Sequence, residues 1–121
     1  MVDVSIIMPM RNASQWLPDT FKSLIEQNFT GTMELSLYND GSTDNSIDIV
    51  HEWEPLLTPM YKIIINGHKE EKARGAGYCR NRAIDASAGR FLCLLDADDI
   101  MLKDRIRLQY EFACNNESTL G

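Results

Sequence analysis

Residues 91–99, Phe-Leu-Cys-Leu-Leu-Asp-Ala-Asp-Asp, join an unbroken apolar run to a cluster of three carboxylates. A short apolar run of this kind is typical of a buried strand in a parallel sheet. Carboxylates delivered by such a strand repel one another, and they are costly to bury unless they are paired, hydrogen-bonded or bound to a metal. The pattern therefore predicts a site for a hard divalent cation that also holds phosphate oxygens. The alternative is a solvated turn whose aspartates begin the next helix, where Asp is favoured as a cap and by the helix dipole.

Composition limits the classes of protein to consider. A chain of 121 residues, 44% of them hydrophobic, is long enough for one small domain with one core. Its formal net charge of −6 argues against a broad nucleic-acid-binding face. No run approaches the roughly 18 apolar residues of a membrane helix, and the N-terminus lacks a secretory pattern, so no membrane partner is expected.

The cysteines indicate the compartment. Cys79, Cys93 and Cys114 are odd in number, widely spaced and free of any Cys-x-x-Cys pair. Neither a disulfide framework nor a structural zinc site is expected from such spacing, and Cys93 is expected to be a small core residue. The expected compartment is therefore the cytosol or the nucleus, and we assign the protein to the cytoplasm.

Strand-like and helix-like segments alternate along the whole chain. The expected strands are residues 4–8, ended by Pro9, and residues 33–38, 61–65 and 91–95. The first expected helix runs from a cap at Asn12 or Ser14 to about residue 27, and the second from a cap at Asp44 until Pro55 and Pro59 end it. Two more are expected over 75–87 and from 102 to about 114. This β-α alternation predicts an α/β fold with a parallel sheet and helices on both faces.

Polar residues follow three of the expected strands. Arg11 and Asn12 follow the first strand, Asp40 follows the second, and the acidic cluster with Asp96 and Asp98 follows the fourth. Ligands of such sheets bind at the carboxyl ends of the strands, near the point where the strand order reverses. With a strand order of 3-2-1-4, Asp40 and the acidic cluster lie on either side of the first strand, in one crevice.

Each of these features also has a simpler interpretation. The segment from Asp40 to Ser42 is also typical of a plain turn. The segment 74–77, Arg-Gly-Ala-Gly, begins a helix and would suit an anion, but such glycines also occur without a ligand. Arg80 and Asn81 are equally compatible with an ordinary helix surface, and the two histidines, His51 and His68, are expected to face solvent.

The commoner nucleotide-binding folds do not match. A dinucleotide fold requires a glycine-rich loop after the first strand, but residues 9–13 are Pro-Met-Arg-Asn-Ala. No Gly-x-x-x-x-Gly-Lys-Ser/Thr segment occurs. A phosphatase with an aspartyl nucleophile would carry its Asp-x-Asp after the first strand, whereas here it follows the fourth.

Four segments in this order resemble family 2 glycosyltransferases, which have the GT-A fold. These are residues 4–9 with Asn12, 38–44, 79–83 and 94–99, and they cover almost the whole chain. Segments 29–36, 74–78 and 105–109 further resemble the group of beta-1,3-N-acetylglucosaminyltransferase-like protein 1, also described as a queuosine-tRNA galactosyltransferase.

The resemblance implies a GT-A (Rossmann-like) nucleotide-sugar-binding half and an inverting, metal-dependent transfer from a UDP-sugar. Asp40 would hydrogen-bond the uracil, Asp96 would face the ribose, and Asp98 would ligate Mn²⁺ or Mg²⁺ bridging the diphosphate. The metal would stabilise the charge that develops on the leaving diphosphate. The implied nucleotide-sugar-binding residues are Pro9, Arg11, Asn12, Asp40, Ser42, Arg74, Arg80, Asn81, Asp96 and Ala97.

The sequence departs from the family in two ways. Many members carry an aromatic residue where Arg11 stands, and Arg11 instead offers a planar guanidinium for stacking on the base or for a phosphate. In the family, the acceptor-binding half and the catalytic base lie downstream of the last matched segment. We therefore expect residues 1–121 to be the N-terminal donor-binding part, with no catalytic residue of its own.

Two other hypotheses remain open. One is a nucleotide-sugar-binding module without turnover, such as a truncated isoform; the other is an unrelated α/β protein with a structural acidic turn, against which the ordered motifs argue. A UDP-sugar is the expected partner, and tRNA is implied as acceptor by the resemblance only. Self-association is also expected, because a sheet that ends at its fourth strand exposes an edge and an apolar face.

Overall fold

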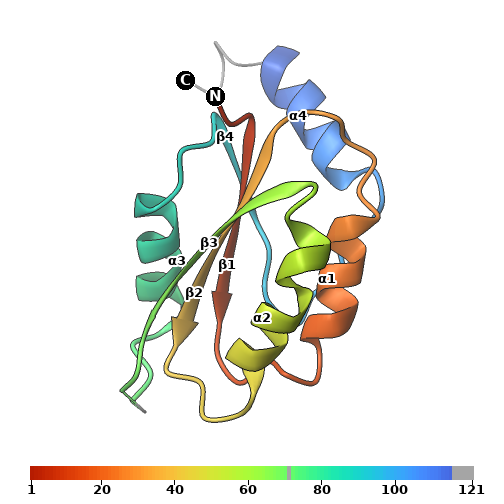
Figure 1. Cartoon of the computed structure of the whole chain (residues 1–121). Coiled ribbons are helices and arrows are strands. Elements are labelled where there is room, and N and C mark those ends of the chain that lie inside the picture. The colour runs from red at the N-terminus through yellow and green to blue at the C-terminus, as the bar shows by residue number, and fades with distance from the viewer. Residues whose placement is uncertain (71, 116–121) are drawn as a thin grey trace.

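In the computed structural model, which describes residues 1–70 and 72–115, four strands form a single sheet between two layers of helices (Figure 1). The strands β1 (Val4–Met10), β2 (Met33–Asp40), β3 (Tyr61–His68) and β4 (Phe91–Leu94) are parallel throughout. Their order is β3-β2-β1-β4. The predicted α/β class and strand order 3-2-1-4 are both confirmed.

The helices divide unequally between the two faces of the sheet. The helices α1 (Leu17–Ile25), α2 (Ser46–Leu57) and α4 (Arg105–Asn115) contribute to the larger cluster on one face, and α3 (Ala76–Asp85) packs on the other (Figure 1). None of the helices in the described part of the chain has the length and apolar character needed to cross a bilayer.

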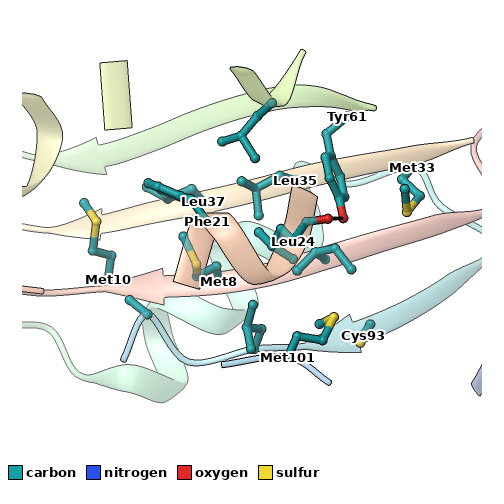
Figure 2. Packing of buried hydrophobic residues seen from close by; sticks show 14 of the residues in the cluster. Met8, Met10, Phe21, Leu24, Met33, Leu35, Leu37, Tyr61, Cys93 and Met101 are labelled. Atoms are coloured by element: carbon teal, nitrogen blue, oxygen red, sulfur yellow. Dashed lines mark hydrogen bonds between the residues drawn. The ribbon is translucent and has the colours of Figure 1, made fainter. Parts of the chain in front are cut away.

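The larger cluster lies between β1, β2 and the helices α1 and α2. Phe21 and Leu24 of α1 are fully buried against Met8 and Leu35, and the Tyr61 hydroxyl donates to the Leu24 carbonyl oxygen at 2.7 Å (Figure 2). Cys93 is buried in the same cluster, as predicted. Burying an aromatic or aliphatic side chain of this size stabilises the fold by about 1.5–3 kcal/mol.

The smaller cluster shows why α3 carries small residues. Cys79 and Ala83 pack against Ile7 and Tyr38 of the sheet. The helix approaches closely enough for the Ser36 hydroxyl to donate to the Ala83 carbonyl oxygen at 2.6 Å. The small side chains of Cys79 and Ala83 therefore allow α3 to pack close to the sheet.

Pro9 does not end β1 as predicted. The Leu95 amide donates to the Ile7 carbonyl at 3.0 Å, so Ile7 faces β4 across the last pairing of these two strands. Backbone groups alternate sides along a strand, so the Pro9 nitrogen, which has no hydrogen, also faces β4. On the other side, β1 stays in register with β2 up to Met10 opposite Asn39. Pro9 therefore coincides with the end of the β1–β4 pairing, while β1 itself continues.

Several helix boundaries also differ from the prediction. Neither Asn12 nor Ser14 caps α1, because the helix begins at Leu17 and its N-cap, Trp16, makes no side-chain capping bond. Helix α2 continues through Pro55 to Leu57, since a proline near the C-terminal end of a helix removes only one late hydrogen bond. Asp44 is not the N-cap residue of α2, although its carboxylate accepts the Ser46 N–H at 3.0 Å.

Gly89 allows the chain entering β4 to approach β1 closely. The Gly89 amide donates to the Ser5 hydroxyl oxygen at 2.8 Å, and a Cβ atom added at Gly89 would lie 2.6 Å from the Ser5 backbone nitrogen. The Ser5 hydroxyl in turn donates to the buried Glu34 carboxylate at 2.6 Å. A side chain at residue 89 would force the backbone of the central strand to move.

We predict that Gly89→Ala lowers the free energy of unfolding by about 1–3 kcal/mol, as expected of overpacking. Gly77→Ala is the matched control, because a Cβ atom at Gly77 meets nothing within 4 Å. Gly77 is the second residue of α3, where alanine should be neutral or stabilise the fold by less than about 1 kcal/mol. Urea denaturation measures both, and equal effects of the two substitutions would contradict the packing argument.

Candidate functional site

A cleft of about 350 Å³ opens at the carboxyl end of the sheet, where β1 and β4 separate. Six of the eleven predicted site residues line it, from the ends of β1, β2 and β4: Pro9, Arg11, Asp40, Asp96, Ala97 and Asp98. The predicted crevice between Asp40 and the acidic cluster therefore exists. Its position follows from the parallel strands, whose carboxyl ends share one edge of the sheet.

The acidic loop presents three carboxylates together. One oxygen each from Asp96, Asp98 and Asp99 lies within 4.8 Å of the others, and all three residues are exposed. The Thr20 hydroxyl of α1 holds this loop, lying 2.9 Å from the Ala97 carbonyl oxygen and 2.8 Å from that of Asp99. Grouped carboxylate oxygens are ligands suited to Mg²⁺ or Mn²⁺, so the donor set fits the predicted metal.

Two expectations about this loop need correction. The carboxylates are not buried, so the cost of desolvation does not by itself require a cation. The aspartates also do not begin the next helix, because α4 starts only at Arg105. What remains is an exposed acidic cluster at the mouth of a cleft.

Asp40 is buried at the opposite side of the cleft, with 4% of its surface exposed. Its Oδ1 accepts hydrogen bonds from His68 Nε2 at 2.7 Å and from the Arg74 amide at 2.8 Å, and its Oδ2 accepts one from the Gly75 amide at 3.1 Å. Burial alone raises the pKa of Asp40, but the hydrogen bonds from Arg74, His68, Gly75 and Cys79 outweigh it and hold the pKa below its ordinary value. Asp40 is thus an ionised anchor between β2, β3 and the start of α3.

His68 was expected to face solvent, and this expectation is wrong. It is the last residue of β3, directly opposite Asp40 in the β2–β3 register, and only 12% of its side chain is exposed. Strand 61–65 was predicted three residues too short, which left His68 in a loop. A longer strand would have placed it beside Asp40.

Asn12 and Ser42 connect the two loops beneath the cleft and do not line it. Asn12 has a positive φ of 48°, and its side-chain oxygen accepts the Thr43 amide at 2.7 Å. The backbone amide of Asn12 donates to the Ser42 hydroxyl oxygen at 3.0 Å. These bonds fix the loop after β1 against the loop after β2.

The predicted cationic residues lie in different places. Arg11 lines the cleft, and its guanidinium donates to the Asp40 carbonyl at 2.9 Å. The Arg74 side chain turns away to Glu70 at 3.0 Å, although its amide holds Asp40. Arg80 and Asn81 are exposed on α3 and do not line the cleft.

Sequence reasoning missed other lining residues, notably Trp16 and Cys79. Trp16 is 44% exposed. A large aromatic residue left exposed just before a helix can indicate a binding site, but the sequence did not show that α1 begins after Trp16. Burial, followed by the charge and hydrogen bond of Asp40, raises the pKa of the Cys79 thiol to about 11. Cys79 is therefore a neutral thiol near neutral pH and a weak hydrogen-bond donor.

A family model described as glycosyl transferase family 2 matches residues 5–120. The chain belongs to this family. It is 32% identical over 109 residues to the putative teichuronic acid biosynthesis glycosyltransferase TuaG of Bacillus subtilis, a match over 90% of this chain and 41% of the relative. It is 33% identical over 113 residues to an Escherichia coli protein, UDP-Glc:alpha-D-GlcNAc-diphosphoundecaprenol beta-1,3-glucosyltransferase WfgD, over 93% of this chain and 42% of that protein. The chain thus spans about two fifths of the length of these relatives.

Solved structures confirm the GT-A fold of this family 2 chain. The crystal structure of S. aureus TarS 1-349 in complex with UDP-GlcNAc superimposes with a TM-score of 0.84 at 24% identity, over 96% of this chain and 32% of TarS 1-349. The mannosyltransferase PcManGT from Pyrobaculum calidifontis, in complex with GDP-Man and Mn²⁺, has a TM-score of 0.67 at 20% identity, over 78% of this chain and 27% of that one.

We predict that Asp40→Asn destabilises the fold at pH 7 by about 1–3 kcal/mol, because an amide cannot satisfy all the donors that the buried carboxylate accepts. The folded pKa of Asp40 is depressed, so ionised Asp40 stabilises the fold above the unfolded value near 3.8. That stabilisation is lost as the pH falls through the folded pKa. Thermal unfolding of wild type and variant should therefore differ most near neutrality, and the difference should shrink as the pH falls below about 3.8 and through the folded pKa of Asp40.

The control for this prediction is Glu52→Gln, a similar change at an exposed position on α2. It should leave the melting temperature nearly unchanged at every pH. A difference between wild type and Asp40→Asn that stays constant from pH 7 to pH 3 would contradict the role given to the ionised carboxylate.

Proposed function

We propose that this chain is the donor-binding half of an inverting, divalent-metal-dependent glycosyltransferase that uses a UDP-sugar. The observation that carries the proposal is the single cleft that brings Asp40 and the 96–99 loop together in a chain of this family. WfgD is named for a UDP-Glc donor, and TarS 1-349 has been crystallised with UDP and with UDP-GlcNAc. These names support a uridine nucleotide as the donor of this chain.

The residues of the cleft suggest how such a donor would lie. Asp40 would accept a hydrogen bond from the uracil, Asp96 would face the ribose, and Asp98 would ligate Mn²⁺ or Mg²⁺ with help from Asp99. When bound, the cation would stabilise the negative charge developing on the leaving diphosphate. The Arg11 guanidinium, already anchored on the Asp40 carbonyl, is positioned for the base or a phosphate. The structurally similar mannosyltransferase PcManGT was crystallised with Mn²⁺, which supports Mn²⁺ as the metal.

The proposal assigns no catalytic base to residues 1–121. The relatives are more than twice as long as the part that this chain matches, and we propose that the acceptor site and the base belong to that further part. The chain alone would bind donor weakly and turn it over poorly. The second candidate, a nucleotide-sugar-binding module without turnover, uses the same cleft and differs only in lacking that part.

We also propose an acceptor and a cellular location. Galactosyl transfer to queuosine-tRNA rests on the resemblance of segments 29–36, 74–78 and 105–109 alone, and transfer of labelled galactose to tRNA by a longer form of the protein tests it. A cytoplasmic location is proposed because Cys79, Cys93 and Cys114 are free thiols. Fractionation of cells expressing the tagged chain tests the location.

Calorimetric titration of UDP into the purified chain, with and without Mn²⁺, tests the donor site. We expect binding that requires Mn²⁺ and is weakened at least about tenfold, or 1.4 kcal/mol, by Asp98→Ala, because that change removes one metal ligand. Asp85→Ala removes an exposed carboxylate on α3, outside the cleft, and should leave UDP binding unchanged. UDP binding that is indifferent to both Mn²⁺ and Asp98 would refute the metal role. Fast transfer by the 121-residue chain would refute the proposal that the base lies outside residues 1–121.

We also propose that the chain self-associates through the β4 edge. The exposed fractions of Leu92 and Leu94 are both 47%, and that of Phe112 on α4 is 61%. Leu92 and Phe112 line an apolar groove between β4 and α4. Contiguous apolar surface beside a strand edge favours association.

Sedimentation velocity over a range of concentrations tests this association. Leu92→Lys should shift the chain toward monomer, because it places a charge beside the strand edge. The control is Leu56→Lys, which changes an equally apolar residue, 57% exposed on α2, and should leave the distribution unchanged. A wild-type chain that stays monomeric at all concentrations would contradict the proposal.

A further inference from the structure

Asp40 and His68 form a closely spaced polar pair behind the cleft. His68 Nε2 lies 2.7 Å from Asp40 Oδ1, and 12% and 6% of the two side chains are exposed. His68 Nδ1 is buried and has no hydrogen-bond partner among the described residues. A proton on Nε2 therefore matches the geometry, because Nε2 then donates to the carboxylate and Nδ1 carries only a lone pair.

The hydrogen bonds of Asp40 leave few positions for a ligand. Each carboxylate oxygen accepts about two hydrogen bonds. Oδ1 is filled by His68 and the Arg74 amide, and Oδ2 accepts the Gly75 amide, with the Cys79 thiol as a further donor to the carboxylate. The thiol is the weakest of these donors, and Cys79 and Gly75 both line the cleft. A ligand N–H would therefore bind at Oδ2, which accepts one backbone amide, whereas Oδ1 already accepts two donors.

The donors also decide what kind of ligand Asp40 can bind. A carboxylate that is held ionised only accepts hydrogen bonds. Uracil presents an N–H at ring position 3, whereas cytosine presents a lone pair at the same atom. A fixed acceptor therefore attracts the first base and repels the second, and discrimination is large where a buried polar group would be left unpaired.

We propose that His68 is a positioning residue for base selection, which fixes Asp40 as an oriented acceptor and so favours uracil over cytosine nucleotides. This role rests on the proposed function, since it assumes that the base lies at Asp40. His68 does not touch the ligand in this scheme. It acts through Oδ1, whose occupation by His68 and Arg74 directs the ligand to Oδ2.

Parallel titrations with UDP and CDP, in the presence of Mn²⁺, test this role. We expect wild type to bind UDP at least about tenfold more tightly than CDP, a ratio within the range expected of one discriminating polar contact. His68→Phe keeps a ring but loses the donor, and should reduce UDP affinity about fivefold to tenfold while changing CDP affinity less than twofold. His68→Gln retains an N–H donor and should keep most of the preference. His51→Phe, at the exposed histidine of α2, is the matched control and should change neither affinity.

The outcomes separate the two proposals. An unchanged UDP-to-CDP ratio in folded His68→Phe, or equal losses for both nucleotides, would overturn the role of His68 and leave the donor site standing. Failure of wild type to bind either nucleotide would overturn the donor site and this inference together. If His68→Phe does not fold, a measurement on wild type still tests the inference. ¹⁵N NMR of the histidines should show His68 protonated on Nε2, with and without UDP. A proton on Nδ1 and none on Nε2 would overturn the inference.

Discussion

The site depends on Pro9, whose nitrogen carries no hydrogen and cannot continue the pairing of β1 with β4. β1 is paired on both sides up to Ile7, and beyond it the next group facing β4 is the proline nitrogen, which cannot donate. The two strands therefore separate at their carboxyl ends, while β1 stays paired with β2 as far as Met10. The cleft lies in this gap, with the acidic loop on the β4 side and Asp40 on the β2 side.

The walls of the cleft are set in place by hydrogen bonds made without any ligand. The Thr20 hydroxyl of α1 bonds two backbone carbonyl groups of the acidic loop. The Asp40 carboxylate accepts two backbone amides just before α3. Asn12 fixes the loop after β1 to the loop after β2. Each bond joins segments far apart in the sequence, so the site is organised as soon as the sheet has formed. Such preorganisation reduces the ordering cost of binding a flexible ligand.

The charged side chains that line the cleft are mostly acidic. Asp40, Asp96 and Asp98 all line it, and the chain as a whole has a net charge of −6. Arg11 is the only cationic side chain lining this cleft in the described part of the chain. A diphosphate would meet net repulsion there, which a divalent ion on the 96–99 loop would reverse.

The sequence alone determined the α/β class and, given the assumed strand order 3-2-1-4, the convergence of Asp40 with Asp96 and Asp98. These follow from apolar periodicity and from the rule that parallel strands end at one edge, both of which are local or topological properties. Only the tertiary structure decided how Pro9, His68 and Asn12 act. The effect of Pro9 depends on which neighbour its nitrogen faces. His68 contacts Asp40 because β3 continues past its apolar residues in register with β2, and Asn12 bonds a loop about 30 residues away. Sequence patterns report which residues are apolar or polar, whereas these roles depend on hydrogen-bond partners that only strand register and loop packing bring together.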